Sequence, residues 1–139
     1  MKDPILETVT NPISEARRYV DNAKQALQKH GQFNPEDKCY DDPKYVKAAG
    51  NYLWLAVLLA LDAVFHVKDM KSNGRVDVGD YRTAVAQRDR KLLKSINNAY
   101  NILHLDMGYD GITNKVLCDE GFRLANDIID RCATLFHNR

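Results

Sequence analysis

The chain has 139 residues, of which 45% are hydrophobic and 28% are charged, and its 20 basic residues nearly balance its 19 acidic ones. This composition excludes a disordered chain, and a domain of this size can bury roughly 68 to 70% of the surface that the unfolded chain exposes. A near-neutral charge excludes a global field that would draw the protein to nucleic acid or a membrane. We therefore expect one globular domain over residues 1–139, with any such binding confined to local patches.

The cysteines and the N-terminal segment indicate a reducing compartment. The chain has three cysteines, Cys39, Cys118 and Cys132, an odd number that cannot all pair in disulfides. Their spacing is not that of a CxxC or Cys/His metal site. The segment from Met1 to Glu7 has neither an apolar core nor the small-residue cleavage site of a signal peptide. We predict a cytoplasmic protein with reduced thiols, no metal and no cofactor.

The first predicted helix begins at Asn11, a suitable N-cap, and Pro12, which suits the first helical position. Apolar residues then recur at helical spacing until Gly31, which stops the helix. A loose turn from Pro4 to Val9 could precede it. The polar segment from Gln32 to Asp42 has no periodicity and is predicted to be a connecting loop.

The longest apolar run, Tyr52 to Leu61, lies in a helix predicted to begin at Pro43 and to end near Lys68. This helix is apolar around most of its circumference, as is typical of a membrane span or of the central helix of a helical domain. Asp62 and His66 interrupt it before the about 18 apolar residues that a span needs. We interpret it as a buried central helix.

The second half of the chain predicts three more helices. Turn residues at Lys71–Gly74 precede a short helix around Tyr81, and Asp89 caps a third long helix with a regular amphipathic stripe. The tight connection Gly108–Gly111 leads to a last helix that begins near Thr113. Since nothing indicates a strand, we predict an all-α protein, an antiparallel up-and-down bundle of four long helices with a short extra helix.

Polar residues on the central helix are the first candidates for a site. At about 100° per residue, Asn51, Asp62 and His66 share one face. Asp62 and His66 are also i and i+4 neighbours, and a carboxylate beside an imidazole could orient a general base or supply half a metal site, which His104 could join. The alternative is that the pair lies at the bundle's edge and bonds to itself or to a helix end. We take these four as candidate ligand-binding residues.

Two further surface features are candidates. Tyr109 and Asp110 could place a phenol and a carboxylate at the rim of a pocket between helices, or they could only form a turn with Gly111. Between Lys68 and Lys94, eight basic residues stand against four acidic ones, a net charge of +4. This segment could contact RNA phosphates, with Tyr81 available for stacking, or be ordinary solvated surface.

An arginine and a histidine near the C-terminus, Arg131 and His137, are the catalytic candidates. Six residues rotate a helix by about 240°, so the two side chains point about 120° apart and one chain would not converge them on a phosphate. A second subunit would have to supply the partner group. The alternative is that both complement the dipole at the end of the helix.

Several segments together resemble a known family: Ala16–Lys24, Tyr45–Gly50 running into Ala60–Val64, and Tyr100–Leu105 with Gly108–Gly111. They look like a small uncharacterised bacterial family that resembles the HEPN-like helical bundles, over about residue 14 to residue 132. The resemblance implies a bundle of four or five helices, commonly dimeric. Such domains occur as metal-independent RNases, as toxins or as partners of small nucleotidyltransferases.

Two functional hypotheses follow from the pattern and the resemblance. The first is a homodimeric binding or interaction module without a catalytic centre, with a protein partner such as a nucleotidyltransferase and no membrane contact. The second is a toxin-like endoribonuclease, because in the RNase members an arginine and a histidine four to six residues later act on RNA across a dimer interface. Arg131 and His137 match that spacing.

Overall fold

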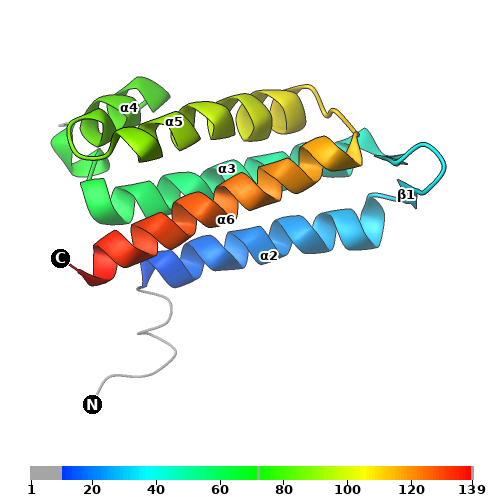
Figure 1. The fold of residues 1–139 in the computed structure, drawn as a ribbon, viewed down its shortest axis with the longest axis horizontal. Helices are drawn as coiled ribbons and strands as arrows, with labels where there is room; N and C mark the ends of the chain where they lie inside the picture. Colours follow the sequence, from blue (N-terminus) through cyan, green and yellow to red (C-terminus); the bar gives the residue numbers. More distant parts are fainter. Residues whose placement is uncertain (1–10, 72, 139) are drawn as a thin grey trace, which may run out of the picture.

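The computed structural model describes residues 11–71 and 73–138 and consists mainly of helices (Figure 1). In chain order its elements are α2 (Pro12–His30), β1 (Phe33–Asn34), β2 (Cys39–Tyr40), α3 (Pro43–Phe65), η1 (Lys68–Met70), α4 (Val78–Ala86), α5 (Arg90–Ala99), η2 (Tyr100–Tyr109) and α6 (Lys115–His137). The all-α prediction fits this architecture apart from the small two-stranded sheet. The turn expected from Pro4 to Val9 lies outside the described residues.

The long helices begin at the residues that the sequence indicates. Their N-caps are Asn11, Asp42, Asp89 and Asn114, whose side-chain oxygens accept backbone N–H groups of the first turn at 3.0, 3.1, 3.0 and 3.0 Å. Each cap satisfies a donor that the helix itself leaves without a partner. The predicted helix starts are therefore confirmed, because they depend only on neighbouring residues.

Consecutive long helical segments run antiparallel, and α3 contacts α2, α6 and η2 (Figure 1). The side chains of Leu53, Val57 and Leu61 on α3 are completely buried. Among the described residues, α3 is the one helix long and apolar enough to cross a membrane, and 61% of its most apolar window is buried. That burial fits the predicted central helix.

The end of α3 differs from the prediction. The helix ends at Phe65 and not near Lys68, because His66 adopts the left-handed conformation, with φ 51° and ψ 42°. Its backbone N–H donates to the Asp62 carbonyl at 2.9 Å. A left-handed residue closes a helix by satisfying a terminal carbonyl and turning the chain away.

The predicted loop from Gln32 to Asp42 contains a hairpin, so the expectation of no strand was wrong here. Phe33 pairs with Tyr40, and Gln32 and Lys38 have positive φ angles of 57° and 55°. The Tyr40 N–H also donates to the carbonyl of Thr113, ahead of α6, at 2.9 Å. Because this tie joins segments far apart in the chain, no local pattern indicates it.

The third long helix is also not regular throughout. After Ala99 it continues as the π-helix η2. The predicted inward residues Leu103 and Met107 are completely buried, so the stripe is right although the helix type is not. Here η2 lies very close to α3, since a Cβ on Gly50 would be 2.5 Å from the backbone nitrogen of Gly108.

Candidate functional site

A cleft of about 870 Å³ lies between α2, α3, η2 and the segment that leads into α4. We call it the aromatic cleft. Its volume falls within the roughly 300 to 1,000 Å³ of small-molecule sites. Its lining combines aromatic rings, apolar side chains of α3 and charged groups, among them Tyr19, Trp54, Leu58, Lys68, Arg75, Tyr81, Tyr100 and His104.

Three rings from two helices form one wall of the aromatic cleft. The Trp54 ring lies 5.7 Å from the Tyr100 ring, at an interplanar angle of 66°, and 5.7 Å from the His104 ring. The Tyr100 and His104 rings, four residues apart on η2, lie 5.2 Å from each other. Tilted and edge-on pairs at these separations are favourable because ring edges and faces carry opposite partial charges.

Two residues that line the aromatic cleft each have a buried polar atom without a hydrogen-bond partner among the described residues: the hydroxyl of Tyr81 and Nδ1 of His104. Tyr81 is only 2% exposed. Its burial, and then the charges of Asp62 and Asp80, raise the pKa of Tyr81 to about 12. The phenol is therefore neutral at physiological pH and available as a hydrogen-bond donor.

Basic side chains line the same cleft. Among the described residues, neither Lys68 nor Arg75 forms an ion pair. The carboxylate of Asp77 is already engaged, because it accepts the Asp80 N–H at 3.0 Å in the capping box of α4. A negative ligand would therefore meet two cations without an ion pair and one carboxylate, that of Asp77.

Nearby, Arg82 lies behind the aromatic wall. Its guanidinium is 5.0 Å from the centre of the Tyr100 ring, and its Nε donates to Asn97 Oδ1 at 2.7 Å. A cation over an aromatic face is attracted to the ring. Arg82 thus holds Tyr100 in place as part of the wall.

The predicted pair of Asp62 and His66 does not form. Asp62 Oδ1 accepts the Lys68 backbone N–H at 2.9 Å, whereas His66 Nδ1 lies 3.9 Å from Asp69 Oδ2 on the exposed surface. The left-handed turn at His66 breaks the helical geometry that the i, i+4 argument assumed. Asp62 thus bonds to the first residue of η1, beyond the end of its own helix.

The other predicted ligand-binding residues are dispersed. Asn51 is exposed, and its Oδ1 borders Gly108. Tyr109, the last residue of η2, is 76% exposed, and Asp110 immediately after it is also exposed. Of the six residues proposed from the sequence as ligand-binding, His104 is the one that lines the aromatic cleft.

Sequence reasoning did not assign Trp54 and Tyr100 to a site. Trp54 lies inside the longest apolar run and Tyr100 within an amphipathic stripe, so both resembled core residues. The spacing of Tyr100 and His104 was an available signal, since aromatic residues four apart share a helical face. Among the described residues no group of His, Cys, Asp or Glu could hold a metal ion.

The catalytic candidates Arg131 and His137 have different surroundings on α6. Arg131 Nε donates to Asp89 Oδ2 at 2.9 Å, and Asp89 is the N-cap of α5. His137, the last residue of the helix, is exposed and its ring is edge-on to Phe136. Arg131 thus ties α5 to α6, and the single chain does not bring the two candidates together.

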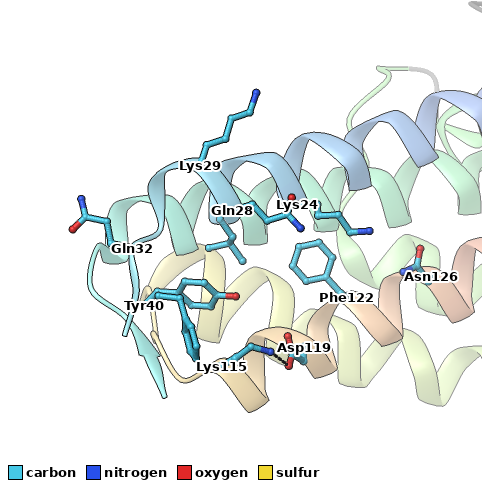
Figure 2. Close-up of a pocket in the computed structure, with 11 residues that line it drawn as sticks. Lys24, Gln28, Lys29, Gln32, Tyr40, Lys115, Asp119, Phe122 and Asn126 are labelled. Atoms are coloured by element: carbon cyan, nitrogen blue, oxygen red, sulfur yellow. Dashed lines mark hydrogen bonds and ion pairs between the residues drawn. The ribbon is translucent and has the colours of Figure 1, made fainter. Parts of the chain in front are cut away.

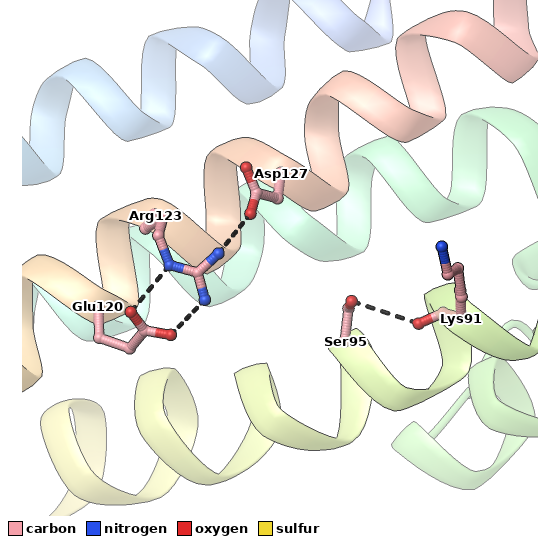
Figure 3. Close-up of polar contacts among 5 residues, drawn as sticks. All are labelled: Lys91, Ser95, Glu120, Arg123 and Asp127. Carbon is pink, nitrogen blue, oxygen red and sulfur yellow. Dashed lines mark hydrogen bonds and ion pairs between the residues drawn. The ribbon is translucent and has the colours of Figure 1, made fainter.

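The surface beside Arg131 is balanced in charge. Arg131 lines a shallow pocket of about 410 Å³ with Lys91, Asp89 and Asp127, two basic and two acidic residues. Figure 3 shows that Arg123 of α6 is likewise held between Glu120 and Asp127, and its Nη1 lies 2.7 Å from Asp127 Oδ2. A surface of paired charges attracts an RNA backbone weakly.

A second mixed pocket, of about 600 Å³, lies where α2 ends and α6 begins (Figure 2). Among its lining residues are Lys24, Lys29 and Lys115. Lys115 Nζ is paired with Asp119 at 2.6 Å, and Lys29 points away from the other lining side chains in Figure 2. Lys24 and Lys29 form no ion pair among the described residues, but neither unpartnered buried polar atom belongs to this lining, so the aromatic cleft is the stronger candidate.

Comparison with known families identifies the relatives of this chain. Residues 11–134 match the family described as Domain of unknown function (DUF5618). The chain belongs to this family. It is also similar to the solved structure of a protein of unknown function from Dyadobacter fermentans, with 38% identity, a TM-score of 0.77, and coverage of 87% of this chain and 92% of that chain. A search of curated proteins finds no match.

Proposed function

We propose that this DUF5618 chain is a HEPN-like binding module that takes a small ligand in the aromatic cleft and has no catalytic centre of its own. The observation that carries the proposal is the pair of unpartnered buried polar atoms at one cleft, the Tyr81 hydroxyl and His104 Nδ1. Buried polar groups in folded proteins are almost always hydrogen-bonded, and an exception calls for an explanation. A ligand that enters the cleft and displaces the atoms now covering these two groups would supply the missing partners.

The binding hypothesis explains more of the structure than the endoribonuclease hypothesis. Arg131 is committed to Asp89, which also caps α5, so its release would cost a tie between two helices. The surrounding pocket has balanced charge. By contrast, the aromatic cleft combines uncommitted hydrogen-bonding atoms with an apolar wall, which is the usual composition of a ligand site.

Intrinsic fluorescence tests this proposal, because Trp54 is the single tryptophan of the chain and lines the cleft. We would titrate the purified protein with a panel of small aromatic compounds, both charged and neutral. At least one should change the Trp54 emission saturably, and His104→Ala should weaken that response. The control is His137→Ala, which alters an exposed histidine at the end of α6. If no compound produces a saturable change, the proposal is wrong.

The proposal further includes a homodimer in the cytoplasm of a bacterial cell, and a protein partner of the kind that the resemblance implies, such as a nucleotidyltransferase. Exposed apolar side chains support an interface near the start of α6, where Ile112 is 41% and Val116 73% exposed. Light scattering on the purified protein measures the mass directly. A Val116→Lys variant should be monomeric, and a monomeric wild-type protein would contradict the dimer.

A further inference from the structure

We propose that the ligand of the aromatic cleft is a planar heteroaromatic acid, with its flat ring against Trp54, Tyr100 and His104 and its anionic group beside Arg75 and Lys68. This inference rests on the proposed function and specifies the chemical class of the ligand. Three independent features of the cleft support it: the shape of the wall, the unpartnered polar atoms and the distribution of charge.

The wall favours a flat, conjugated ring. Trp54, Tyr100 and His104 have centroids 5.2 to 5.7 Å apart, so the three rings contact one another, with Trp54 8% exposed. Leu55 and Leu58 of α3 extend this surface, and Leu55 is 47% exposed. A planar ligand would bury this apolar surface and make stacked or edge-on ring contacts. An aliphatic ligand would gain only the burial.

The unpartnered atoms require a ring that carries hydrogen-bonding atoms. The hydroxyl of Tyr81 can donate one hydrogen bond and accept others, and Nδ1 of His104 can do either, depending on its tautomer. Both are buried without a partner. A purely hydrocarbon ring would leave both atoms without a partner. A ring nitrogen or carbonyl within reach of Tyr81 would accept a hydrogen bond from its hydroxyl. The ligand is therefore heteroaromatic.

The charges around the cleft orient the acid group. Burial, and then the charges of Asp62 and Asp80, raise the pKa of Tyr81, so this phenol stays neutral and can donate to the ligand ring. Lys68 and Arg75 are unpaired cations among the described residues. An anionic group is therefore attracted to the two cations, and Arg75 can bind a carboxylate with two parallel hydrogen bonds.

Calorimetric titration of the purified protein tests the ligand class with three matched probes. Quinoline-6-carboxylate has the ring nitrogen and the charge on opposite rings, quinoline-6-carboxamide lacks the charge, and naphthalene-2-carboxylate lacks the nitrogen. We expect the first to bind at least about tenfold more tightly than the amide and several-fold more tightly than the naphthoate, since charge-assisted hydrogen bonds are the stronger ones.

Variants assign each preference to a residue. Arg75→Gln should remove most of the preference for the acid over the amide, and Tyr81→Phe most of the preference for quinoline over naphthalene. Lys94→Gln is the matched charge control, because Lys94 is an exposed lysine of α5 that does not line the cleft. It should leave both preferences unchanged. Circular dichroism verifies that each variant is folded.

The outcomes separate this inference from the proposed function. If the acid and the amide bind equally well, or the amide binds better, the heteroaromatic acid is wrong while a binding module stands. If naphthoate binds as well as quinoline-6-carboxylate, the assignment of Tyr81 is wrong. If none of the three probes binds, the ligand class is overturned, and the broader aromatic panel then decides whether the cleft binds a ligand at all.

Discussion

Replacing Tyr81 by phenylalanine should stabilise the protein in the absence of a ligand. The substitution keeps the buried ring and removes the hydroxyl, which is buried and has no hydrogen-bond partner. In the folded state that hydroxyl has lost its hydrogen bonds to water without replacement. Most substitutions of buried residues destabilise, so the expected sign is unusual and informative.

The size of the gain follows from the cost of the orphaned group. A buried polar group without a partner costs about 1 to 3 kcal/mol, and the phenylalanine ring retains the apolar contacts. We subtract a small loss of packing where the oxygen was, and expect a gain of about 1 to 2 kcal/mol. For a domain of this size, each kcal/mol of added stability raises the melting temperature by about 4 °C.

Urea denaturation followed by Trp54 emission measures the free energy of unfolding. If the dependence of this free energy on urea concentration is the same in both proteins, the denatured states are the same. Tyr109→Phe is the control, because that side chain is 76% exposed and its change should stay within about 0.5 kcal/mol. A Tyr81→Phe protein less stable than the wild type would refute the reasoning, since the hydroxyl would then be hydrogen-bonded in solution.

The stability gained by the same substitution should depend on pH. Tyr81 has a pKa of about 12 in the folded protein, above the ordinary value of 10.0. Between these values the unfolded chain loses the proton while the folded protein keeps it, so wild-type stability falls as pH rises from about 10 to 12. The Tyr81→Phe protein lacks this loss. Its advantage should therefore widen over that range, and a constant difference would contradict the raised pKa.

Three further predictions concern the scaffold. Gly50→Ala should cost at least about 2 kcal/mol in urea denaturation, because its Cβ would meet the backbone of η2; an unchanged midpoint would contradict the close approach. Asp89→Ala should lower the free energy of unfolding by about 1 to 2 kcal/mol, because it removes the cap of α5. Asp89→Asn keeps the cap and loses only the charge paired with Arg131, so it should cost less than about 1 kcal/mol. Equal losses in the two variants would contradict the role of the cap. Burial raises the pKa of Cys118 and Cys132 to about 12, above the ordinary value of 9.0. The free energy of unfolding should therefore fall as pH rises from 9.0 towards 12, because only the unfolded chain then loses these protons. Urea denaturation that gives the same free energy across this pH range would contradict the prediction.

The polar site residues show why helical spacing predicts packing better than chemistry. Asp62 and His66 have the correct separation for a pair, yet the left-handed turn at His66 sends the two side chains to different partners. Arg131 matches a spacing associated with RNA cleavage, yet it is bonded to Asp89, 42 residues away in the chain. A spacing rule assumes a continuous helix and no competing partner. The helix ends before His66, and Asp89 is a competing partner of Arg131.

The helix starts and the buried stripes were determined by the sequence itself. Caps such as Asn11 and Asp89 act on N–H groups two or three residues away, and the inward positions Leu103 and Met107 follow from the repeat. These are short-range effects, which a local pattern contains in full.

Only the tertiary structure decided the hairpin, the π-helix and the aromatic cleft. The hairpin depends on a backbone bond from Tyr40 to Thr113, and η2 lies against α3 at Gly50. The cleft brings Trp54, Tyr81 and His104 together from three separate elements. Such contacts depend on how the helices pack in space, and residues distant in the chain carry no local signal that they will meet.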